Sequence, residues 1–318
     1  MKFDDPIILF SPTGAQLSLR THYAQIAPRG VIHINHGLAE HTARYAPFAG
    51  FLARQGFHVY AHDHRGHGLT RASDAPIGRF ATRKGTRKLI EDVEAVHELI
   101  AQKHPGLPIV LFGHSMGGLI ALNHLLNHPS RIHALAIWNA NFQSGPALFA
   151  ARAILLWERF RLGSDVPSHF LPKLTFQAWA KSFSHHRSPF DWLSRDTAQV
   201  DAYISDPLCG WNGSVSLWFD LLSLSQTGAQ NKNFSHIRKD LPIHLLGGAQ
   251  DPATNGGKAV RQLGKRFCMM GFEDVTCIIH GKNRHESLHE INRTQIMDDF
   301  GLWLDRICAA PKKPNHPV

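Results

Sequence analysis

Short apolar runs alternate with stretches of helical periodicity over most of the chain. The apolar runs lie at residues 7–10, 17–23, 31–35, 58–62, 109–113, 134–139, 243–247 and 275–280. The first two runs flank Thr13 and Gly14, which predicts an opening antiparallel hairpin, and the later runs are typical of buried strands. Helical spacing covers residues 45–55, 88–104 and 117–128. This alternation predicts an α/β fold with a mostly parallel central sheet flanked by helices.

The alternation stops between residues 141 and 233, where strand-like runs are absent and Trp, Phe, Ser and His accumulate. We therefore expect a helical cap inserted at 141–233, between two parts of a core at 1–140 and 234–310. The last residues, 311–318, are rich in Pro and Lys and are expected to form a disordered tail.

The composition is that of an ordinary globular chain, with 318 residues of which 43% are hydrophobic and 19% charged. A formal net charge of +9 and a basic cluster at 79–88 suggest nucleic-acid binding at first sight. No nucleic-acid-binding motif accompanies the cluster, so we expect a solvated basic face and no nucleic-acid partner. Peripheral contact with an anionic membrane surface is compatible with the same charge.

The first residues carry acids where a signal peptide needs bases, and no window approaches the run of about 20 apolar residues that spans a bilayer. The four cysteines, at 209, 268, 277 and 308, show no C-x-x-C spacing, so neither a zinc ribbon nor a redox pair is predicted. We therefore expect a soluble, cytoplasmic protein with reduced thiols. The sequence does not indicate an oligomeric state.

A pentapeptide in the middle of the core, Gly113-His-Ser-Met-Gly117, matches the pattern G-x-S-x-G. An apolar run at 109–112 precedes the motif, and helical spacing follows it. A strand, a sharp turn and a helix are the setting that exposes a nucleophilic serine at the end of a sheet. Glycines on both sides are needed because larger side chains would clash with the adjacent backbone. The motif therefore makes Ser115 the candidate nucleophile.

A serine hydroxyl becomes a good nucleophile only when a base removes its proton, and the base needs an anion to orient it. The chain offers both groups in the order expected of this fold, because Asp251 follows the run at 243–248 and His285 follows the run at 275–280. Both residues lie in loops after predicted strands, where functional groups of open α/β sheets gather. We therefore predict a catalytic triad of Ser115, His285 and Asp251.

Backbone donors for an oxyanion are also expected near the nucleophile. His36-Gly-Leu38 ends the run at 31–35 with a glycine-assisted turn, and Met116 directly follows Ser115. The N–H groups of Leu38 and Met116 are the predicted oxyanion hole. A plain strand-to-helix turn is the alternative interpretation of residues 36–38.

One helical face of the predicted cap is apolar and aromatic. It is formed by Phe149, Ala153, Leu156, Trp157 and Phe160. Packing against the core is the simpler interpretation of this face. A mobile lid over an acyl pocket is the other, and it makes Phe149, Trp157 and Phe160 tentative substrate contacts together with His114.

Five sequence blocks resemble a known family when taken together and in order. They are His36-Gly-Leu-Ala-Glu-His41, Asp63-His-Arg-Gly-His-Gly68, Gly113-His-Ser-Met-Gly-Gly118, Asp251-Pro252 and Arg284-His-Glu286. The family is the monoacylglycerol lipase and bacterial lysophospholipase branch of the α/β-hydrolases, which is grouped with the S33 serine aminopeptidases. The resemblance covers residues 30–304 and implies an α/β-hydrolase fold with a cap, no cofactor, and the catalytic roles predicted above. The segment 206–210 also resembles one that lies near the pocket in those enzymes.

The combined prediction is a serine hydrolase that cleaves carboxylic esters through an acyl-enzyme, acting on a small lipid-like ester such as a monoacylglycerol or lysophospholipid. Acyl transfer and aminopeptidase activity on the same triad are alternatives, because the acyl-enzyme is common to these reactions. A zinc hydrolase that uses an H-E-x-x-H motif and a non-catalytic binding protein on the same fold are more distant alternatives.

Two segments have metal-site patterns. His285-Glu-Ser-Leu-His289 matches the H-E-x-x-H pattern of zinc hydrolases, but it follows a strand and a loop, and a zinc site needs both histidines on one helix. The segment 62–67 has Gly66 where a second metal would need a carboxylate. We therefore predict no metal site, with Asp63 and Arg65 anchoring their loop.

Overall fold

The structure, a computed structural model, describes residues 3–309, so the predicted tail at 311–318 lies outside the described residues. The described chain forms an eight-stranded sheet with the order β1-β2-β4-β3-β5-β6-β7-β8. The strands are β1 Ile7–Phe10, β2 Gln16–His22, β3 Gly30–Asn35, β4 Phe57–His62, β5 Ile109–His114, β6 Ala134–Trp138, β7 Ile243–Gly248 and β8 Val275–His280. Strand β2 pairs antiparallel with β1 and β4, and all later pairs are parallel. The predicted α/β class is confirmed, and each apolar run forms a strand whose ends differ by at most one residue.

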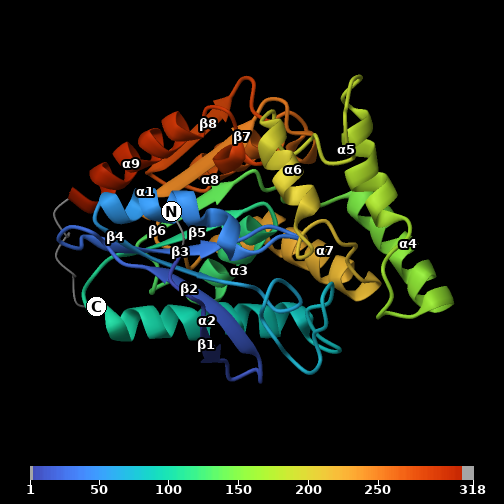
Figure 1. The fold of residues 1–318 in the computed structure, drawn as a ribbon, viewed down its shortest axis with the longest axis horizontal. Coiled ribbons are helices and arrows are strands. Elements are labelled where there is room, and N and C mark those ends of the chain that lie inside the picture. Colours follow the sequence, from blue (N-terminus) through green and yellow to red (C-terminus); the bar gives the residue numbers. More distant parts are fainter. Residues whose placement is uncertain (1–2, 310–318) are drawn as a thin grey trace.

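Helices connect the strands and cover both faces of the sheet (Figure 1). The core helices are α1 Ala46–Arg54, α2 Gly85–Lys103, α3 Met116–Asn127, α8 Lys258–Met269 and α9 Arg293–Ala309. Four short 3-10 turns, η1 Thr42–Tyr45, η3 Asn231–Phe234, η4 Pro252–Thr254 and η5 Ser287–His289, lie in connecting loops. Helices α1 and α9 share one buried apolar cluster with the sheet, and α2, α3 and α8 share another on its opposite face. Because both faces are covered, the central strands β3, β5 and β6 are buried along their whole length.

The segment between β6 and β7 contains helices and no strand, and Figure 1 shows its helices together at one end of the sheet. Its elements are α4 Pro146–Leu162, the π-helical turn η2 Lys173–Gln177, α5 Ala178–Lys181, α6 Thr197–Ser205 and α7 Val215–Ala229. Helix α7 packs on α3, and its Leu217, Leu221 and Leu224 belong to the same apolar cluster as α3. The last helix of this segment is therefore part of the main core. Within residues 3–309, no helix is both long enough and apolar enough to cross a membrane.

The aromatic face of α4 does not pack against the core, contrary to the simpler expectation from the sequence. Phe149, Trp157 and Phe160 are 64%, 46% and 90% exposed. The opposite face, with Leu148 and Leu155, is buried where α4 packs on α7. Helix α4 thus has two apolar faces, and within residues 3–309 the face with Leu148 and Leu155 is buried whereas the aromatic face is exposed.

Histidines form an unusual buried cluster between the sheet and α2 and α3. The fully buried members are His33, His36, His62, His64, His67, His97 and His124. Their rings lie close together, with centroids 4.4 Å apart for His36 and His64 and 5.2 Å apart for His97 and His124. Burial lowers the pKa of every member, to about 4 for His36, His62 and His97 and to about 3 for His67. The folded chain therefore holds these rings neutral.

The histidine cluster predicts that the folded chain loses stability in mild acid. A ring whose pKa is about 6.5 when unfolded and about 4 when folded binds more protons in the unfolded state between these values. The free energy of unfolding should therefore fall by at least a few kcal/mol as the pH drops from about 6.5 to about 4. Urea unfolding at a series of pH values measures this slope. His33→Leu removes one of the seven buried rings and should reduce the slope, whereas the exposed His186→Gln should leave it unchanged. Equal stability at both ends of the window would refute the argument.

Candidate active site

Ser115 lies at the sharp turn between β5 and α3, with φ 53° and ψ −117°, a strained conformation for a residue with a side chain. The glycines around it permit this turn. A Cβ atom on Gly113 would lie 2.1 Å from the Gly117 carbonyl oxygen, and one on Gly117 would lie 2.0 Å from the Asn35 carbonyl oxygen. Backbone therefore packs directly on backbone here, as the sequence motif required, and the serine side chain is held above the end of the sheet.

The three residues of the predicted triad are brought together from three separate loops. His285 Nε2 lies 2.9 Å from Ser115 Oγ, and His285 Nδ1 lies 3.0 Å from Asp251 Oδ1. Asp251 is fully buried and His285 is 4% exposed. This is the order of contacts by which an imidazole can take a proton from a serine hydroxyl while a carboxylate orients it.

The Asp251 carboxylate is fixed by neutral donors as well as by His285. Its Oδ1 accepts the Ala253 N–H at 2.9 Å, and its Oδ2 accepts bonds from Thr254 Oγ1 at 2.8 Å and Asn139 Nδ2 at 3.1 Å. Buried polar groups need such partners. Asn139, at the end of β6, was not predicted from the sequence, because a lone asparagine after a strand carries no distinctive pattern.

The protonation of His285 is set by two opposing effects. Burial opposes the charged imidazolium, but the charge of Asp251 and its hydrogen bond outweigh this, so the pKa of His285 is raised above its usual 6.5. The neighbouring His114 ring, 5.0 Å away between centroids, behaves in the opposite way. Burial and the charge of His285 lower the pKa of His114 to about 3, so it stays neutral beside the triad.

The predicted oxyanion donors both line the same pocket as Ser115. Within residues 3–309, neither the Leu38 N–H nor the Met116 N–H is bonded to a protein acceptor. Met116 begins α3, where the first N–H groups have no partner in the helix. Both donors are therefore available for a negatively charged oxygen near Ser115.

A buried ion-pair network fixes the loop that carries Leu38. The Glu40 carboxylate accepts the Gly37 N–H at 2.6 Å and the Tyr45 hydroxyl at 2.8 Å. Arg44 donates to Glu40 at 2.5 Å and to both Glu286 oxygens at 2.6 Å. Because Glu286 directly follows His285 in the chain, one guanidinium connects the loop of Leu38 to the loop of His285. Sequence reasoning missed this role, since Arg44 and Glu286 are separated by 242 positions.

A cavity of ≈ 190 Å³ opens onto Ser115 and is lined mainly by apolar side chains. These include Leu119, Phe176, Trp179, Trp192, Trp211, Trp218, Leu221 and Leu222. Of the tentative substrate contacts, His114 lines the cavity, whereas Phe149, Trp157 and Phe160 do not and are exposed on the outer, aromatic face of α4. The apolar pocket expected from the cap is present, but it is built from the aromatic residues at 176–218 and from α3.

The two metal-like segments have structural explanations. His285 points at Ser115 and Asp251, Glu286 pairs with Arg44, and only 287–289 form a short 3-10 turn. In residues 3–309, His285, Glu286 and His289 do not form a group that could hold a metal ion.

In the segment 62–67, Asp63 accepts bonds from Thr42 and the Leu69 N–H. Arg65 pairs with Asp92 at 2.7 Å, so both residues anchor the loop as expected.

Comparison with known proteins identifies the family to which the chain belongs. A sequence model of the family described as "Serine aminopeptidase, S33" matches residues 26–292. A monoacylglycerol lipase of Mycolicibacterium smegmatis is 28% identical over 87% of this chain and 88% of its own length. A human monoglyceride lipase is 29% identical over 91% of this chain and 87% of its own. A thermostable carboxyl esterase from Bacillus coagulans, 21% identical, shares the fold with a TM-score of 0.87 over 97% of this chain and 99% of the esterase.

The geometry of His285 predicts the pH dependence of turnover. The base must be neutral, and its pKa is raised, so the rate of ester hydrolysis should rise with pH through a midpoint above 6.5. Asp251→Asn removes the charge that raises this pKa, so the midpoint should move to lower pH while kcat falls by about 10⁴-fold. A pH–rate profile measures both, with the surface variant Asp305→Asn as the matched control. A midpoint that does not move in Asp251→Asn would contradict the assignment.

Proposed function

The chain belongs to the serine aminopeptidase S33 family of α/β-hydrolases and cleaves carboxylic esters, and on that premise we propose that it hydrolyses monoacylglycerols with Ser115, His285 and Asp251 as its catalytic triad. The observation that carries the proposal is the unbroken chain of contacts from Ser115 to Asp251 at the opening of an apolar pocket. Similarity to monoacylglycerol lipases over most of the chain supports monoacylglycerols as the substrate. Acyl transfer, amide hydrolysis, zinc chemistry and a purely binding role are not favoured.

In the proposed reaction, His285 Nε2 takes the Ser115 proton while Oγ attacks the ester carbonyl. The resulting oxyanion accepts hydrogen bonds from the Leu38 and Met116 N–H groups. The imidazolium then gives its proton to the leaving glycerol oxygen, and an acyl-enzyme remains. Water, deprotonated by the same histidine, cleaves the acyl-enzyme, and its proton returns to Ser115.

The acyl chain is proposed to occupy the cavity between α3 and the segment 141–233, which we regard as a cap inserted into the core. The cavity walls are mostly aromatic and aliphatic, which suits a hydrocarbon chain more than a charged or peptide group. Trp192 lies against the His285 ring, 5.0 Å away between centroids, so the cap also shields the base from water.

We further propose that the outer face of α4 contacts an anionic membrane surface, from which lipid-like substrate is drawn. Phe149, Trp157 and Phe160 are exposed there. Cations lie on the same surface, with Arg161 over the Trp157 ring and Lys173 over the Phe170 ring. Aromatic side chains interleaved with cations suit the boundary between headgroups and acyl chains. We also propose a cytoplasmic location, in keeping with the four free cysteines.

Ser115→Ala should abolish hydrolysis of monoacylglycerols, by about 10⁵- to 10⁶-fold in kcat, because the nucleophile is lost with little change in packing. A serine-directed phosphonylating reagent should label the unmodified chain at Ser115 and should fail to label the variant. The exposed Ser182→Ala is the matched control. Hydrolysis that persists in Ser115→Ala would overturn the mechanism. Cleavage of lysophospholipids or aminoacyl amides that is faster than cleavage of monoacylglycerols would overturn the proposed substrate.

Phe160→Glu should weaken binding to anionic lipid vesicles without lowering the rate on a short, water-soluble ester, because residue 160 is exposed and does not line the cavity. Vesicle co-sedimentation measures the binding. Met269→Glu on α8, where the native side chain is 78% exposed, is the matched control. Equal binding by the two variants would show that α4 is not the membrane-facing surface.

A further inference from the structure

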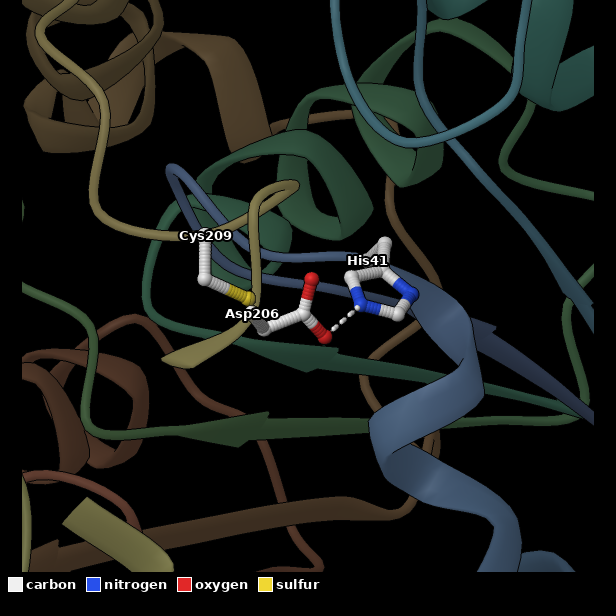
Figure 2. Close-up of side chains that lie close together, drawn as sticks. All are labelled: His41, Asp206 and Cys209. Carbon is white, nitrogen blue, oxygen red and sulfur yellow. Dashed lines mark hydrogen bonds and ion pairs between the residues drawn. The ribbon is translucent and has the colours of Figure 1, made fainter. Parts of the chain in front are cut away.

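Three potential metal donors meet where the cap touches the oxyanion loop (Figure 2). His41 follows the loop that carries Leu38, and Asp206 and Cys209 belong to the turn after α6. An imidazole nitrogen, a carboxylate oxygen and the thiol sulfur lie within 4.8 Å of one another. His41 Nε2 and Asp206 Oδ2 are 2.8 Å apart, and the Cys209 sulfur lies on the other side of the carboxylate in Figure 2.

The donor set suits zinc. One nitrogen, one oxygen and one sulfur ligand match the mixed preference of Zn²⁺, whose bonds to these atoms are about 2.0–2.3 Å long. Around a tetrahedral ion such bonds separate neighbouring donors by about 3.3–3.8 Å, so small side-chain movements would close the site. Three protein ligands leave the fourth position for water.

The surroundings favour a cation. Burial raises the pKa of the Cys209 thiol, and the charged side chains that act on it include the carboxylates of Glu40, Asp206 and Glu286 and the guanidinium of Arg44. Carboxylates outnumber guanidinium groups among these side chains, and Arg44 is already engaged by Glu40 and Glu286. His41 is 6% exposed, so an ion there would be shielded from salt.

The position of the cluster gives metal binding a consequence for the active site. The Ala39 carbonyl oxygen accepts the Gly210 N–H at 3.0 Å and the Tyr203 hydroxyl at 2.9 Å, so the cap turn already touches the loop of Leu38. Leu38, Ala39 and Gly210 all line the substrate cavity. An ion held by His41 and Cys209 would draw these two segments together beside the oxyanion donor.

We propose that His41, Asp206 and Cys209 form a zinc site whose occupancy inhibits ester hydrolysis by locking the cap turn onto the oxyanion loop. Binding converts the Cys209 thiol to a zinc-bound thiolate and releases its proton to solvent. The inhibition rests on the proposed function, whereas the binding does not.

The binding arm uses Co²⁺ in place of zinc, because a cobalt–thiolate bond gives a near-ultraviolet charge-transfer band that histidine and carboxylate ligands do not give. We expect one equivalent of Co²⁺ to produce this band in the full chain, Zn²⁺ to displace it, and Cys209→Ser to abolish it. Asp206→Asn should weaken it. Cys277→Ser should retain the band. His128→Ala should also retain it, because His128 belongs to a separate donor group, formed with Glu94 and His124 in residues 3–309. An absent band, or one that persists in Cys209→Ser, overturns the site.

The activity arm measures turnover of a short ester with and without saturating Zn²⁺. We expect zinc to remove most of the turnover of the unmodified chain and of His128→Ala, and to leave Cys209→Ser at its metal-free rate. Inhibition that survives Cys209→Ser, or full activity with the site occupied, overturns the inhibitory role. A chain that shows the cobalt band but hydrolyses no ester in metal-free buffer would refute the proposed function while the site stands.

Discussion

The buried guanidinium of Arg44 is the interaction on which the geometry of the site depends. Burial acts against its charge, but Glu286 and Glu40 outweigh burial and raise the pKa of Arg44 further. The same contact holds the pKa of the buried Glu286 carboxyl well below its usual range, so both partners stay charged. Removing one partner of such a pair leaves an uncompensated charge and costs about 3–5 kcal/mol. The network thus fixes the distance between the loop that offers oxyanion donors and the loop that carries the base.

The strained turn at Ser115 is a second constraint, and it relies on packing. Gly113, Gly117 and Asn35 bring three backbone segments into direct contact beneath the serine. The apolar cluster around α3 holds these segments in place, and α7 of the cap contributes to that cluster. The nucleophile therefore depends on the cap for its stability as well as for its pocket.

The sequence predicted the framework well and the long-range contacts poorly. Strands and the elbow follow from local patterns, since apolar runs and the G-x-S-x-G turn depend on residues close together in the chain. Asp251 and His285 followed from their places after strands. By contrast, the pairing of Arg44 with Glu286 and the bond from Asn139 to Asp251 arise only when distant segments meet. The orientation of α4 could not be read from its periodicity, because both of its faces are apolar and the partner α7 decides which one is buried.

The cap holds both loops of the active site, and this limits which part of it can move. The Glu286 and His285 N–H groups donate to the Leu193 and Trp192 carbonyls at 2.7 Å and 3.3 Å. The turn after α6 is bonded to the oxyanion loop in the same way. Movement of residues 192–210 would therefore disturb the base and the oxyanion donors together. Helix α4 lacks such bonds to either catalytic loop within the described chain, and it carries the exposed aromatic face. The outer face of α4 can therefore make the proposed membrane contact without disturbing the catalytic groups.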